Sequence, residues 1–179
     1  PSALPQRVNA KLVRILQRAQ PVYVNIHFNH PAELTEAAAR CCYRLSDGGI
    51  PLGSQTVLLK GVNDRPAVIA RLMNQLLKIR VRPYYLLQAD LVRGTEHFRT
   101  AIQTGLKIIK SLRGNISGMA VPSYVIDLPG GGGKVPLLPE YVVKLDKDEI
   151  VVRNYQNKHY RYPQPDRLSK TACPNVQVY

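Results

Sequence analysis

The segment Asp127-Leu128-Pro129-Gly130-Gly131-Gly132-Gly133-Lys134 places one lysine directly after four consecutive glycines. Because glycine has no Cβ, the backbone of such a loop can adopt positive φ and turn several N–H groups toward one anion, such as a phosphate. A lysine beside this loop has two chemical uses. Its ammonium can pair with a nucleotide phosphate, or its amine can form a Schiff base with an aldehyde cofactor.

Two positions exclude a nucleotide-binding P-loop. That motif requires a glycine where this chain has Leu128 and a Ser or Thr hydroxyl where it has Val135. Pro139 also argues against a long helix that begins at Lys134, and such a helix supplies the dipole of a P-loop. A glycine-rich linker is the structural alternative, but linkers usually mix Ser with Gly and do not follow an apolar strand. The sequence therefore favours the Schiff base at Lys134, with Gly130, Gly131, Gly132 and Gly133 contacting the cofactor phosphate.

The rest of the chain alternates predicted strands and helices with short connections, which is typical of parallel βα units. Apolar spacing predicts helices at 6–20, after Asn29-His30-Pro31, after Asn63-Asp64 and at 100–113; strands are expected at 22–28, 55–59, 81–87 and 118–126. After Pro139 the pattern predicts a small antiparallel meander with strands at 141–145, 150–155 and 158–162. We expect a βα domain at 1–138, a β extension at 139–163 and a loosely ordered tail at 164–179.

Polar side chains gather at the ends of the predicted parallel strands. In open α/β sheets and in barrels alike, ligands bind at the carboxyl ends of the strands. Asp90 and Asp127 follow two of these strands and could hold a cationic group such as an ammonium, although Asp127 could instead cap the loop. His27 is a candidate cofactor contact or a strand-end histidine with a structural role, and Gln55 is a weaker candidate.

The paired aromatic residues Tyr84 and Tyr85 lie within a predicted strand. Side chains alternate between the two faces of a strand, so we expect one ring at the ligand-binding end and the other in the core.

Composition narrows the class of protein. The 179 residues are 45% hydrophobic, enough for one sizeable core, and no apolar run approaches the roughly 20 residues that span a bilayer. We expect a cytoplasmic protein without membrane contact. The net charge of +13 is spread over every segment rather than clustered, so nucleic acid is not the favoured partner.

The three cysteines have neither a disulfide framework nor metal-ligand spacing. Cys41 and Cys42 fall on the apolar face of a predicted helix and are expected to be buried, whereas Cys173 lies in the tail and has no assigned role. No metal ligand is therefore predicted in this chain.

Several motifs in one order resemble the lysine 2,3-aminomutase family. They are Val24-Asn25-Ile26-His27-Phe28-Asn29-His30-Pro31, Gly61-Val62-Asn63-Asp64, Arg82-Pro83-Tyr84-Tyr85, Glu96-His97-Phe98-Arg99-Thr100 and Pro129-Gly130-Gly131-Gly132-Gly133-Lys134. The resemblance implies a radical S-adenosylmethionine enzyme that also uses pyridoxal phosphate and moves an amino group from carbon 2 to carbon 3 of an amino acid. It further implies the second half of a partial TIM-like (β/α) barrel.

By this resemblance, Lys134 would carry pyridoxal 5'-phosphate as an internal aldimine, and Asp90 with Asp127 would bind the side-chain ammonium of lysine. His27 and Gln55 would lie near S-adenosylmethionine. The family's cluster motif, Cys-x-x-x-Cys-x-x-Cys, is absent, so the ligands of the [4Fe-4S] cluster are expected outside this chain. A full-length protein would be a homo-oligomer. Arginine as the substrate, or a basic binding fragment without catalysis, remain the alternatives.

Overall fold

The computed structural model describes residues 3–164 and divides into two compact units, Pro1–Leu138 and Pro139–Tyr179. The first unit is a mixed α/β structure built on a five-stranded sheet, and the second contains a three-stranded antiparallel sheet. Residues of the tail beyond 164, including Cys173, lie outside the described part of the chain.

The sheet of the first unit has the strand order β1-β2-β3-β4-β5. Strands β1 to β4 are parallel, and β5 runs antiparallel to β4. The strands are β1 (Val24–His27), β2 (Leu52–Leu58), β3 (Val81–Gln88), β4 (Ser123–Leu128) and β5 (Gly133–Pro136). The helices are α1 (Ala10–Arg18), α2 (Glu36–Asp47), α3 (Pro66–Lys78) and α4 (Ile102–Leu112). Short 3-10 turns cover Pro5–Arg7, Pro31–Glu33, Glu96–Phe98, Gly118–Ala120 and Pro129–Gly131.

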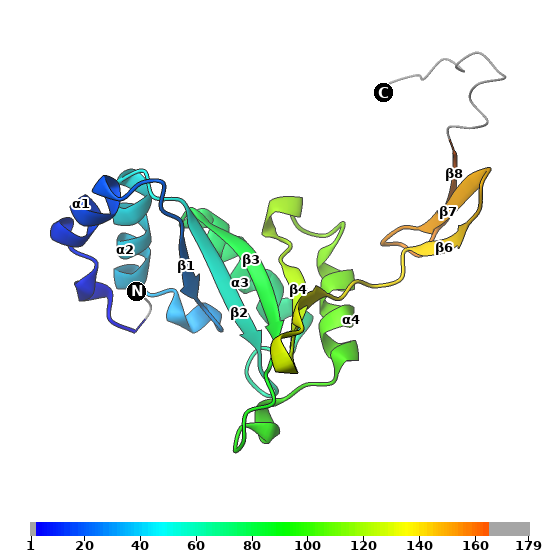
Figure 1. Ribbon diagram of the computed structural model, residues 1–179, viewed down its shortest axis with the longest axis horizontal. Helices are drawn as coiled ribbons and strands as arrows, with labels where there is room; N and C mark the ends of the chain where they lie inside the picture. Colours follow the sequence, from blue (N-terminus) through cyan, green and yellow to red (C-terminus); the bar gives the residue numbers. More distant parts are fainter. Residues whose placement is uncertain (1–2, 165–179) are drawn as a thin grey trace, which may run out of the picture. The chain divides into compact units, whose positions relative to one another are not determined.

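One face of this sheet forms the hydrophobic core. Alternate residues of the strands, including Ile26, Leu58, Leu86 and Tyr124, are almost fully buried where α2, α3 and α4 pack behind the sheet (Figure 1). Cys41 and Cys42 on α2 belong to this core, which confirms that they are buried. The opposite face of the sheet is more open, because no described helix of this unit lies over it. Residues of β2 whose side chains point to this face, such as Gln55 and Val57, are only half-buried.

The structure corrects several predicted boundaries. The segment predicted as a strand at 118–126 begins with the 3-10 turn Gly118–Ala120, and β4 extends to Leu128. The helix predicted at 6–20 is divided into a 3-10 turn and α1, because the side chain of Asn9 accepts a hydrogen bond from the backbone N–H of Leu12 and starts α1 there.

Two helices also begin later than the sequence predicts. Helix α3 begins after Arg65 with Pro66 in its first turn, and the buried Asn63 side chain bonds backbone groups of the preceding segments instead. His30 caps a single 3-10 turn together with Glu33, whereas α2 is capped by Thr35. Short polar side chains near a helix start satisfy backbone groups in several ways, so their type alone does not fix the first residue.

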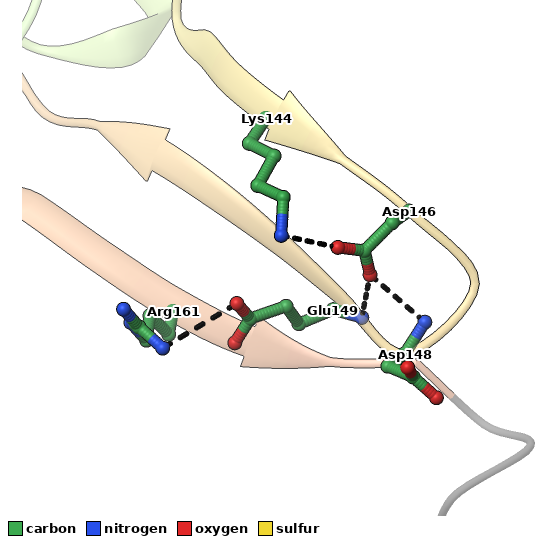
Figure 2. Close-up of polar contacts among 5 residues, drawn as sticks. All are labelled: Lys144, Asp146, Asp148, Glu149 and Arg161. Carbon is green, nitrogen blue, oxygen red and sulfur yellow. Dashed lines mark hydrogen bonds and ion pairs between the residues drawn. The ribbon is translucent and has the colours of Figure 1, made fainter.

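The second unit contains β6 (Val142–Leu145), β7 (Glu149–Arg153) and β8 (His159–Pro163), paired antiparallel in this order. Its first turn is held by Asp146, whose carboxylate accepts hydrogen bonds from the backbone N–H groups of Asp148 and Glu149 and pairs with Lys144 at 2.6 Å (Figure 2). Glu149 also pairs with Arg161 across β7 and β8 at 3.5 Å (Figure 2). The predicted meander is therefore present, with strand ends shifted by one or two residues.

No helix among residues 3–164 is long and apolar enough to cross a bilayer.

The close contact between α4 and β4 predicts the effect of a methyl group at Gly105. A Cβ built at Gly105 would lie 2.2 to 2.6 Å from the ring and hydroxyl of the buried Tyr124. We expect Gly105→Ala to lower the free energy of unfolding by about 1–3 kcal/mol, since overpacking outweighs the gain of roughly 1 kcal/mol in helix propensity. Thermal unfolding measures this change. Gly118→Ala, which meets open space, is the matched control, and equal melting temperatures for the two variants would contradict the prediction.

The turn at Asp146 predicts a pH effect on the second unit. The hydrogen bond from Lys144, followed by those from the backbone of Glu149 and Asp148, lowers the pKa of Asp146 from its usual 3.8 to about 2. Because the folded-state pKa is depressed, the stabilisation of the turn is present above pH 4 and is lost as the pH falls toward 2. Amide chemical shifts of Asp148 and Glu149 should titrate near pH 2, and Lys144→Gln should raise this midpoint. A midpoint near 3.8 in the unchanged chain would contradict the assignment.

Candidate active site

The glycine segment forms a tight hairpin rather than an open loop. Gly130, Gly131 and Gly133 have φ values of 69°, 81° and 77°, a region that other residues rarely adopt. The hairpin turns the chain back along β4, and Lys134 consequently lies in β5, directly opposite Asp127 of β4. The sequence analysis missed β5. The feature that could have predicted β5 is the apolar Val135 directly after the glycine segment. An apolar strand, a glycine turn and a second apolar residue in this order are typical of a hairpin.

Lys134 and Asp127 form an ion pair across this hairpin. The hydrogen bond to Asp127 is the main cause that raises the pKa of Lys134, and the charges of Asp127, Tyr85 and Asp90 act in the same direction, while partial desolvation opposes them. The side chains of both partners are about two-fifths exposed, at 40% for Lys134 and 41% for Asp127. At neutral pH, Lys134 is therefore an ammonium that ligands can reach.

The other predicted cofactor residues lie in one row on the open face of the sheet. His27 of β1 is opposite Gln55 of β2, Gln55 is opposite Tyr85 of β3, and Tyr85 is opposite Ser123 of β4. Side chains alternate along a strand, so Asp127 lies on the same face as Ser123, four residues earlier. The open face thus carries the row of His27 and Gln55 together with the pair of Asp127 and Lys134.

Tyr84 and Tyr85 do not occupy opposite faces, so this prediction was wrong. A β-bulge interrupts the register between Ser54 and Gln55 on β2, and the extra residue on β3 is Tyr84. Both rings consequently lie on the open face, where their centroids are 3.8 Å apart and the hydroxyl of Tyr84 donates to that of Tyr85 at 2.9 Å. Tyr85 lies beside Gln55 and within electrostatic range of Lys134, so it is one of the two rings at the site, where the sequence predicted only one.

Asp90 and Asp127 line the same cavity of about 350 Å³ at the carboxyl ends of β3 and β4. Arg99 also lines this cavity and brings a positive charge to its wall. The two carboxylates that the sequence placed on neighbouring strand ends are therefore close in space. Their arrangement suits a ligand that carries an ammonium group.

A buried polar network positions the segment that carries Asp90. The side-chain amide of Gln88, at the end of β3, donates to the backbone oxygen of Thr100 at 2.8 Å. Tyr124 of β4 donates its hydroxyl to the oxygen of the same Gln88 amide at 2.6 Å, and burial raises the pKa of Tyr124 to about 12, so it stays a donor. The network joins both ends of the loop after β3 to β4, which fixes the wall of the cavity.

The described residues differ in how well they suit the cofactors that the family resemblance implies. An amine beside a turn of positive-φ glycines fits an aldehyde with a phosphate group. An iron–sulfur cluster does not fit. No group of three or more metal-binding side chains occurs among residues 3–164, and Cys41 in the core donates its thiol to the backbone oxygen of Pro5.

Burial also makes the second core thiol unsuitable as a ligand. Desolvation, with a smaller effect of Cys41, raises the pKa of Cys42 to about 11, which disfavours the thiolate that binds metal.

Comparison with known proteins assigns the chain to a family. Residues 109–179 match the family model described as Lysine-2,3-aminomutase. The L-lysine 2,3-aminomutase of Clostridium subterminale is 50% identical over 165 residues, which are 92% of this chain and 40% of that protein. The chain belongs to the lysine 2,3-aminomutase family.

Two further relatives are a putative lysine 2,3-aminomutase and a glutamate 2,3-aminomutase. The putative L-lysine 2,3-aminomutase of Aquifex aeolicus is 53% identical over 163 residues, covering 90% of this chain and 44% of that protein. The glutamate 2,3-aminomutase of Clostridioides difficile is 46% identical over 155 residues, covering 87% of this chain and 37% of its own length. The chain thus spans about two-fifths of the length of the relatives that it matches. Family membership by itself leaves the amino acid substrate open.

Proposed function

We propose that this chain supplies the cofactor lysine and the substrate-binding carboxylates of an L-lysine 2,3-aminomutase, an isomerase that interconverts L-lysine and β-lysine. The observation that carries the proposal is the cross-strand pair of Lys134 and Asp127 beside a glycine hairpin, together with a cavity that both Asp127 and Asp90 line. The family relationship supports the type of reaction.

Lys134 is the residue that would hold pyridoxal 5'-phosphate. Its Nζ ends on the open face of the sheet and is partly exposed, so an aldehyde can reach it. The positive-φ glycines that precede it would contact the phosphate through backbone N–H groups. When bound, the cofactor supplies an extended π system that can delocalise an unpaired electron while nitrogen migrates. The chain's own contribution is to fix the position of Nζ.

Asp90 and Asp127 would select lysine over an acidic substrate. Two carboxylates in one cavity attract an ammonium through charge-assisted hydrogen bonds and repel the side-chain carboxylate of glutamate. This distinction matters because the family includes a protein named glutamate 2,3-aminomutase. Lysine is therefore the substrate that the charges of the cavity favour.

His27 and Gln55 would lie near S-adenosylmethionine. They are paired in register on β1 and β2 of the open face; Gln55 is opposite Tyr85 in the same row, and His27 is one strand further. Residues 3–164 contain no group of three or more side chains that could hold a metal, and by the family resemblance the [4Fe-4S] cluster would be held by other residues of the full-length protein. In this proposal the parallel sheet is part of a (β/α) barrel, and the open face is its interior.

Covalent labelling tests the role of Lys134. The chain is incubated with pyridoxal 5'-phosphate, reduced with borohydride and mapped by mass spectrometry. We expect the pyridoxyl group on Lys134. In Lys134→Gln, both this label and the visible absorbance of the bound cofactor should be lost. Lys144→Gln is the matched control, because Lys144 is also a strand lysine paired with an aspartate. Label spread evenly over surface lysines, or unchanged absorbance in Lys134→Gln, would refute the proposed function.

A further inference from the structure

The carboxylate of Asp127 already has an ammonium partner in this structure. Lys134 lies opposite it in the register of β4 and β5 and forms the ion pair described above. Asp127 also lines the cavity that Asp90 lines. A cationic ligand that enters this cavity would therefore compete with a group of the chain itself.

The competitor and the ligand are chemically alike. The end of a lysine side chain is a primary ammonium, and so is the end of the substrate that the cavity charges favour. The competitor is also tethered, because the cross-strand register holds Lys134 beside Asp127, and tethering gives a high effective concentration. The pair is nevertheless partly exposed to solvent, and such pairs contribute about 0–1 kcal/mol, so a ligand can displace it.

The charged groups around Lys134 favour this resting state. Asp127 on β4, Tyr85 on β3 and Asp90 after β3 all raise the pKa of Lys134, and Asp127 does so most. Arg99 is the positively charged residue that lines the cavity with the two aspartates. Lys134 stays protonated near neutral pH, which preserves its charge as the partner of Asp127.

We propose that Lys134 is the resting occupant of the cation site formed by Asp127 and Asp90, and that this site becomes fully available to a ligand ammonium when Nζ of Lys134 is bound covalently by an aldehyde. The second half of this statement rests on the proposed function. The first half, self-occupation of the site, depends only on the ion pair and the cavity.

The covalent step removes the competitor and is balanced without a redox partner. The ammonium of Lys134 releases one proton to solvent, and the resulting amine adds to the aldehyde carbon. The two remaining N–H protons leave with the carbonyl oxygen as water, and a carbon–nitrogen double bond remains. Because coupling between two ligands is reciprocal, a cation in the cavity should in turn favour attachment of the aldehyde.

Binding of a cation that cannot form an imine tests self-occupation. N,N-dimethylbutylamine, a tertiary amine that is protonated at pH 7, is titrated calorimetrically into the chain and its variants. Lys134→Gln should bind it more tightly than the unchanged chain, by about fivefold if the lost pair contributes about 1 kcal/mol. Adding Asp127→Asn to Lys134→Gln should remove this gain. Lys144→Gln, the matched control in the second unit, should bind as the unchanged chain does. Equal affinities for Lys134→Gln and Lys144→Gln would overturn the proposal.

A second measurement needs no variant of the site. In the unchanged chain, acetylation of Lys134 by acetic anhydride at pH 8 should be slower than acetylation of the exposed Lys11. The tertiary amine should increase the acetylation rate of Lys134, because it displaces Lys134 from Asp127. A Lys134 rate that does not respond to the amine would contradict the proposal. Neither measurement uses an aldehyde. Failure of pyridoxal phosphate to label Lys134 would therefore refute the proposed function, whereas self-occupation of the cation site is tested by these two measurements alone.

Discussion

The antiparallel pairing of β5 with β4 is the constraint on which the candidate site depends. Four parallel strands alone would leave Lys134 at the end of a glycine segment, with no fixed position. The hairpin through Gly130 and Gly133 turns the chain back, and the register then sets Lys134 opposite Asp127. One backbone arrangement therefore brings together the amine and the carboxylate that the proposed chemistry needs.

The core supports this arrangement from the other face of the sheet. Tyr124 on β4 is packed against Gly105 of α4 and bonded to Gln88 at the end of β3. These contacts fix β3, β4 and the loop that carries Asp90 as one unit, so the two aspartates line one cavity. The buried contacts on one face of the sheet thus fix the positions of the polar groups at the carboxyl ends of the strands and on the open face.

In the proposed function, the same pair would link binding of the cofactor to binding of the substrate. As an ammonium, Lys134 would compete with a ligand for the carboxylate of Asp127; as the amine left after it releases a proton, it would be the group that adds to an aldehyde. Conversion of that amine to an imine would remove its positive charge from beside Asp127 without requiring the sheet to move. If the proposal holds, the carboxylate of Asp127 in this strongly basic chain would be paired with the chain's own lysine until an aldehyde binds that lysine.

The sequence by itself determined the order of the helices, the parallel strands and the antiparallel meander, and the burial of Cys41 and Cys42, because apolar periodicity is a local signal; it also singled out Lys134 as the candidate amine but missed β5. Only the tertiary structure decided that Lys134 lies in a strand opposite Asp127, that Asp90 lines the same cavity, and that a bulge places both Tyr84 and Tyr85 on the open face. Register and bulges depend on pairing between segments far apart in the chain, and no local pattern of residues encodes that pairing by itself.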